Sequence, residues 1–208
     1  MSQTFDIDLV KLRCDHEQPG EPGSDEVYLV AFGVSGTGQR FAPKIIKVGD
    51  FSDGDVTPAS YRTNLFSLTL DRNETIVATS FVVFERDSGD MAGNLSKIGQ
   101  RFNNMMDTWT KVSQPYGNYQ HIHAFALTMM HMPFFVEVSG QSFWNDDDVD
   151  PNPMFIDHFA SSFAELPNQR AKHHFRVSTE AGLYFFEFEA RFSPPDPVLD
   201  PGLVTRAQ

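Results

Sequence analysis

The sequence predicts a mainly β protein, built as an antiparallel β-sandwich with one or two short helices inserted. Apolar and polar residues alternate over several segments, which is the period-two pattern of a strand with one buried face. Other segments are dense runs of β-branched and aromatic residues. These segments recur roughly every 8–15 residues between Gly-, Pro- and Asp-containing turns, a spacing typical of a sandwich.

The first half of the chain carries five of the expected strands. Pro43 has no backbone N–H to donate, so the strand that contains it should lie at a sheet edge or begin there. Residues 15–25 and 49–55 are rich in acidic residues and glycine, and we expect them to form loops. The expected strands are residues 5–14, 27–34, 41–48, 65–70 and 75–84.

The second half mixes helical and extended patterns. Apolar side chains at steps of three and four predict an amphipathic helix over residues 95–112, with Asn94 as its cap. Phenylalanines four residues apart predict a second short helix over residues 154–166. The remaining strands are expected at residues 121–130 and 133–138, and as a hairpin of residues 173–177 and 183–192.

No obvious linker divides the chain. We therefore expect a single composite domain over residues 1–192, with a weak boundary near residues 113–119. Residues 193–208 carry four prolines and are expected to form an extended tail.

The charge balance narrows the classes of partner. The 208 residues include 28 acidic and 16 basic side chains, for a formal net charge of -12. Such a field repels phosphates and argues against nucleic-acid binding, whereas it favours cations and basic partners.

Cysteine usage and the N-terminal sequence indicate a compartment. Cys14 is the single cysteine, so no intrachain disulfide can form, and its alternation with apolar positions predicts a small core residue. The first residues lack the basic start and apolar core of a signal peptide, and no apolar run reaches the length of a membrane span. We expect a cytoplasmic protein, with export by a signal-less route left open.

Acidic loops suggest a cation site. The apolar strand at residues 75–84 runs into a loop that carries Glu85, Asp87, Asp90 and Asn94. Carboxylates held close together repel one another, and a hard cation such as calcium relieves that repulsion through oxygen ligands. A second cluster at residues 145–150 opens like an EF-hand loop, but it lacks the glycine and glutamate that such a loop needs later.

Two segments resemble C2 domains. Residues 23–30, Gly-Ser-Asp-Glu-Val-Tyr-Leu-Val, resemble the segment in which an acidic C2 loop precedes a strand. Residues 83–87, followed by Asn94 and an Ile-Gly pair at 98–99, resemble the later C2 loop with acids two residues apart. The resemblance implies a C2-like sandwich whose two loops share calcium at one end and dock on anionic lipid or protein. It also implies a ligand set of Asp15, Asp25, Glu85, Asp87, Asp90 and Asn94.

Histidines offer an enzymatic alternative. His121 and His123 would lie on one face of a strand, and two imidazoles with a carboxylate can hold zinc or iron. The jelly roll of cupins uses such a pair. Here Gly117 has the wrong spacing, and Glu137 lies too far downstream.

The sequence therefore predicts a binding or interaction module rather than an enzyme. In the first hypothesis the module is calcium-dependent and docks to a protein or an anionic surface. In the second it is a metal-independent acidic assembly protein, or an inhibitor or immunity-type protein with a basic partner. In the third it is a cupin-like metal enzyme that uses His121 and His123.

Overall fold

The computed structural model describes most of the strands and part of one helix. The described residues are 3–17, 24–35, 39–70, 76–85, 154–159, 169–179 and 182–193, with residues 96, 99, 100, 102–104, 106–108 and 111 of the helical stretch.

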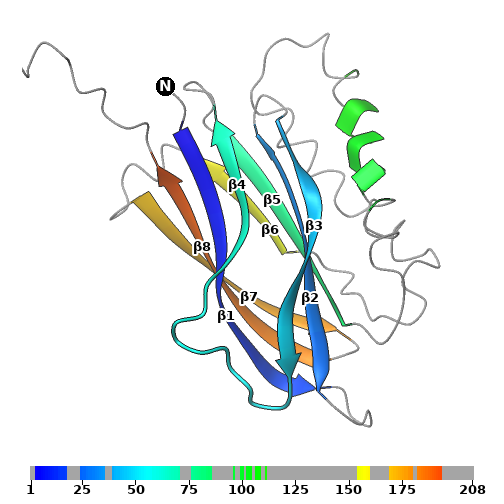
Figure 1. Ribbon diagram of the computed structural model, residues 1–208, viewed down its shortest axis with the longest axis vertical. Coiled ribbons are helices and arrows are strands. Elements are labelled where there is room, and N and C mark those ends of the chain that lie inside the picture. Colours follow the sequence, from blue (N-terminus) through cyan, green and yellow to red (C-terminus); the bar gives the residue numbers. More distant parts are fainter. Residues whose placement is uncertain are drawn as a thin grey trace, which may run out of the picture.

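The described strands form two four-stranded antiparallel sheets that face each other, so the predicted antiparallel β-sandwich is confirmed (Figure 1). In the first sheet the order is β4 (Thr63–Leu70), β1 (Gln3–Glu17), β8 (Gly182–Ser193) and β7 (Arg170–Thr179). In the second it is β3 (Arg40–Phe51), β2 (Asp25–Ser35), β5 (Ile76–Glu85) and β6 (Met154–Phe159). Because β1 pairs with β8, segments from both ends of the sequence share one sheet.

The core lies between the sheets, where the apolar positions of the alternating strands meet. Phe81 of β5 stacks on Phe188 of β8 with ring centroids 4.7 Å apart, and neither side chain is exposed to solvent. Cys14 is also fully buried, as its position in the alternation predicts. The apolar set of β1 changes parity after Leu9 because the register shifts between Leu9 and Lys11, which is the effect of a β-bulge.

The second sheet is covered on its outer side as well. Nearly every residue of β2 is buried, and Phe32, which points away from the core cluster, lies 5.5 Å from the Phe102 ring. Phe102 belongs to the helical stretch, where all the described residues between 96 and 111 are helical, as the spacing predicts. The helix lies beside β3 (Figure 1), and an ion pair of 2.6 Å between Arg40 and Asp107 joins them.

Several boundaries differ from the prediction. The helix predicted over 154–166 is wrong at its start, because Met154–Phe159 is strand β6 and pairs with β5. A short run of large apolar residues fits a helix face and a buried strand equally well, and here the long-range pairing decides. The loop expected at 15–25 begins later, because β1 continues to Glu17. The loop expected at 49–55 also begins later, because β3 continues to Phe51.

The other strand predictions that fall on described residues are confirmed. Pro43 lies in β3, which is an edge strand among those described, as a missing N–H requires. The hairpin of the last two strands is present as β7 and β8. The strands expected at 121–130 and 133–138 and the tail beyond Ser193 lie outside the described residues. No helix in the described part of the chain is long and apolar enough to cross a membrane.

Candidate functional site

Two of the six residues expected to bind calcium have described side chains, and the structure does not bring them together. Asp15 lies on the outer face of the first sheet, where its carboxylate pairs with Arg13 at 2.6 Å and Arg176 at 3.4 Å. Asp25 is buried at the start of β2 and accepts a hydrogen bond from the Tyr184 hydroxyl, inside the sandwich.

The other four expected ligands cannot be placed as a site. The backbone of Glu85 ends β5, opposite Val27, but its side chain lies outside the described part, as do Asp87, Asp90 and Asn94. His121 and His123 of the enzymatic hypothesis also lie outside it. Within the described residues, no three His, Cys, Asp or Glu side chains are grouped so that they could hold a metal ion. Calcium binding therefore stays a prediction.

The structure instead assembles charged side chains on the outer side of the β4-β1-β8-β7 sheet, which we call the charged face. Charged residues occupy the positions of β1, β7 and β8 that alternate with the core positions, so the pleat places them all on one side. Its carboxylates are Asp6, Asp8, Asp15, Glu187 and Glu189, and its basic groups are Lys11, Arg13, Arg62, Arg170, Lys172, Arg176 and Arg191.

Acidic and basic groups lie at different depths in this face. The five carboxylate side chains are only 5–18% exposed, whereas the six ion-paired basic side chains are 34–67% exposed. Long arginine and lysine stems lie over the shorter acids and carry their charge outward. The outermost layer of this face is therefore basic, although the whole chain has a net charge of -12.

Arg62 connects two strands at the centre of the face. Its guanidinium pairs with Asp8 of β1 at 2.6 Å and with Glu189 of β8 at 2.8 Å. Asn64 donates a further hydrogen bond of 2.9 Å to Asp8. The hydrogen bond to Glu189 is the main cause that raises the pKa of Arg62, so the guanidinium stays charged at any working pH.

Glu187 of β8 is held in the same way by side chains of β7. Lys172 donates a hydrogen bond of 2.5 Å to its carboxylate, and His174 Nδ1 lies 3.8 Å away. The hydrogen bond from Lys172 lowers the pKa of Glu187 and raises the pKa of Lys172. At the far end of β1, the hydrogen bond from Arg13 likewise lowers the pKa of Asp15. The Arg13 guanidinium also lies 5.2 Å from the centre of the Phe185 ring.

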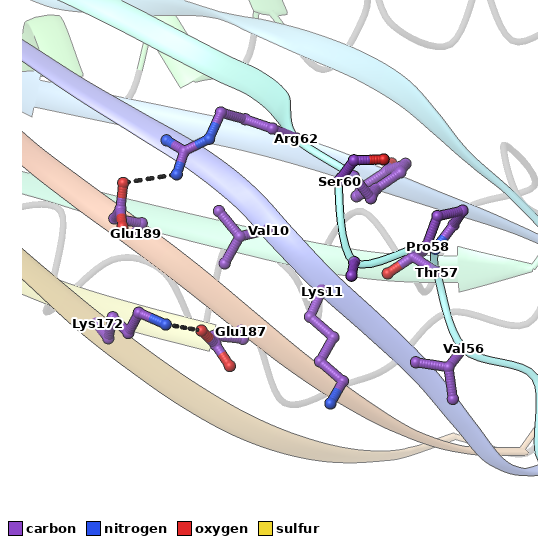
Figure 2. Close-up of a pocket in the computed structure, with 12 residues that line it drawn as sticks. Val10, Lys11, Val56, Thr57, Pro58, Ser60, Arg62, Lys172, Glu187 and Glu189 are labelled. Carbon is purple, nitrogen blue, oxygen red and sulfur yellow. Dashed lines mark hydrogen bonds and ion pairs between the residues drawn. The ribbon is translucent and has the colours of Figure 1, made fainter.

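A groove of about 600 Å³ opens on the charged face (Figure 2). Its floor is the part of β1 at Val10 and Lys11 together with Glu187 and Glu189 of β8. The segment 56–62 between β3 and β4 forms one wall, and Lys172 of β7 lies opposite. Figure 2 shows the Arg62–Glu189 and Lys172–Glu187 pairs on the β8 side of the groove.

Sequence reasoning missed this site because its signal is only partly local. Lys11, Arg13 and Asp15 alternate with Leu12 and Cys14, and Glu187, Glu189 and Arg191 alternate with large apolar residues. Each pattern by itself indicates only a strand with one solvent-facing side. The site could have been found by adding the charges on the solvent-facing sides of neighbouring strands, but this requires knowing the order of the strands in the sheet.

The comparisons with known proteins give no family. No protein-family model matches the chain, and no curated protein matches it either. Among solved structures, the chain is similar to human GIVD cytosolic phospholipase A2 in complex with methyl gamma-linolenyl fluorophosphonate, at 8% sequence identity and a TM-score of 0.38. That match covers 92% of this chain and 17% of the phospholipase chain.

Proposed function

We propose that this chain is a binding module that docks an anionic protein partner on the charged face. The observation that carries the proposal is the layering of the face, with carboxylates beneath and guanidinium and ammonium groups above. At physiological ionic strength, charges are screened beyond about 8 Å, so a partner in contact responds to the outer layer rather than to the net charge.

The chemistry of the face supports binding rather than catalysis. A general acid or base works best when its pKa lies near the working pH. Here the pKa values of Asp15 and Glu187 are lowered by the arginine and lysine that bond them, so both carboxylates stay ionised. Guanidinium groups at the surface suit a partner's carboxylates, because one guanidinium can donate hydrogen bonds to both oxygens of a carboxylate at once.

Poly-L-glutamate is a suitable probe because it presents carboxylates without a fold of its own. We expect it to bind the protein, and the double variant Arg13→Gln with Arg176→Gln to bind about tenfold more weakly, as measured by fluorescence anisotropy. The matched control is Lys44→Gln with Lys111→Gln, which removes two charges on β3 and the helical stretch, where both lysines are exposed. Thermal melts verify that both variants fold.

Two results would overturn the proposal. One is an equal loss of affinity in the control variant, which would mean that total charge rather than the charged face attracts the probe. The other is tighter binding of polylysine than of polyglutamate, which would favour the acidic assembly or inhibitor with a basic partner.

Calcium dependence remains a separate prediction for the loop that follows β5. Calcium that binds only the folded state should raise the melting temperature as its concentration rises toward about 1 mM. Asp87→Asn should remove this shift while leaving the melting temperature in a chelator near that of the unchanged protein. A melting temperature that does not respond to calcium would leave the module metal-independent.

A further inference from the structure

We infer that the groove on the charged face receives an extended segment of the anionic partner, with a carboxylate on Lys11 and an apolar side chain against Val56. This inference rests on the proposed function and specifies which chemical groups of the partner the module recognises. It is argued from the formation of the groove, from the charges in it and from its apolar wall.

The groove forms where the pairing between β1 and β4 ends. Their pairing ends at Leu9 and Thr63, and an isolated bridge between Arg13 and Val56 brings the two segments together again further along. Between these points, the N–H of Thr57 donates a hydrogen bond of 3.0 Å to the Leu12 carbonyl. The rest of the segment 56–62 thus forms a wall beside β1 that hydrogen bonds hold in place, so the groove needs little rearrangement to bind.

Lys11 is the cation of the groove that is still available. Its cross-strand partner is Glu187, but that carboxylate is already bonded by Lys172 at 2.5 Å. Arg62 is committed in the same way to Asp8 and Glu189. Lys11 makes no hydrogen bond or ion pair with a described residue, and Figure 2 draws no interaction for it, although its charge adds to the effect of Lys172 in lowering the pKa of Glu187.

The balance of charge selects an anion as the occupant. Three cations line the groove, Lys11, Arg62 and Lys172, against the two carboxylates Glu187 and Glu189. Asp8 shares Arg62 with Glu189, and Arg170 lies 3.4 Å from Glu189 as a further cation. With these neighbours counted, four cations face three carboxylates, so the ammonium of Lys11 is in excess. One carboxylate of a partner would neutralise it in a partly desolvated setting, where a charged hydrogen bond is stronger than in water.

The apolar part of the groove calls for a side chain beside that carboxylate. Val56 is 47% exposed and is the exposed large hydrophobic residue among those described. It lies on the wall near Pro58 and Ala59, and the bulge of β1 adds Val10 to the floor. An aliphatic group of the partner that covers the exposed Val56 side chain removes apolar surface from water and so stabilises the complex. In an extended peptide, residues two apart point to the same side, so one segment can present both groups.

The experiment uses fluorescein-labelled peptides of the repeat Ser-Glu-Ser-Leu, with Ser-Gln-Ser-Leu and Ser-Glu-Ser-Ser as matched peptides. We expect Lys11→Met to weaken binding of the first peptide about tenfold and to abolish the preference for glutamate over glutamine. Lys11→Arg should retain this preference, because it keeps the charge. Val56→Ser should abolish the preference for leucine over serine and leave the preference for glutamate.

The outcomes separate this inference from the function on which it rests. If polyglutamate still depends on Arg13 and Arg176 but Lys11→Met leaves the glutamate preference unchanged, the groove is not the anchor and only this inference falls. If polyglutamate does not bind at all, the proposed function falls first. Lys44→Met is the control for loss of a lysine elsewhere, and it should change neither preference.

Discussion

His173 and His174 are neighbours in β7, yet the strand places them on opposite sides of the sheet. His174 is exposed beside Glu187, whereas His173 alternates with core residues and its Nε2 atom is buried. Burial is the main cause that lowers the pKa of His173 below the ordinary value of 6.5, and the nearby His174 adds to the effect. The folded protein therefore binds a proton at His173 less readily than the unfolded chain does.

This difference predicts a loss of stability in mild acid. As the pH falls below 6.5, the unfolded chain takes up the proton first, so the free energy of unfolding decreases until the pH passes the lower folded pKa. Each pKa unit of lowering is worth about 1.4 kcal/mol. Urea denaturation at about pH 7.5 and about pH 5.5 should show a smaller decrease for His173→Gln than for the unchanged protein. His16→Gln, which removes an exposed histidine outside this pair, is the control, and an equal decrease in all three proteins would contradict the prediction.

Cys14 illustrates at the same scale how a core position controls reactivity. Burial raises the pKa of its thiol to about 12, and Asp25, Asp53 and Glu17 add to the shift through their negative charges. The thiolate is the reactive form, so the folded protein should react with thiol reagents only when it opens. The reaction rate should rise with urea in parallel with unfolding, and a fast reaction in the absence of urea would contradict this.

At the scale of the elements, Gly182 allows the β7–β8 hairpin to meet the end of β1. It pairs with Thr179 across the hairpin and with Glu17 across the neighbouring strand. Its φ angle is +151°, and a Cβ atom there would lie 2.4 Å from the carbonyl oxygen of His16. The backbone of β1 cannot retreat without breaking its ladder to β8.

Gly182→Ala should therefore destabilise the fold by about 2 kcal/mol or more. Gly54 is a matched control, because its φ angle is +81° but a Cβ atom would meet nothing within 4 Å. Gly54→Ala should cost only the conformational strain of about 1 kcal/mol. Urea denaturation of the two variants measures the difference, and equal losses would show that the contact with β1 is not tight.

At the scale of the whole molecule, a basic face on an acidic protein makes binding depend on ionic strength in two opposing ways. At about 0.01 M salt the Debye length is about 30 Å, so an anionic partner is repelled by the net charge of -12. At about 0.15 M the partner senses mainly the outer layer of the charged face, and at about 1 M the screening weakens that attraction too.

Affinity for polyglutamate should accordingly pass through a maximum at intermediate salt. Anisotropy titrations from about 0.01 M to about 1 M sodium chloride test this, with the Arg13→Gln and Arg176→Gln variant as reference. A monotonic fall from the lowest salt upward would mean that the acidic remainder of the molecule does not oppose binding.

The sequence by itself determined where most strands lie, that Cys14 is buried and that Pro43 marks an edge, because each of these follows from a few neighbouring residues. Period-two alternation is a local property and needs no knowledge of the partner strand. The sequence did not determine β6, since a short apolar run is compatible with helix and strand until β5 is placed beside it.

Only the tertiary structure decided the charged face and its groove. β1 and β8 are separated by most of the chain, so nothing in either segment says that Asp8 and Glu189 will share Arg62. The depth at which each charge lies, and the excess of Lys11, depend on the order of four strands and on one bulge. Charge pairing between distant segments is a consequence of packing, and this is why the binding surface could be recognised only after the sheets were assembled.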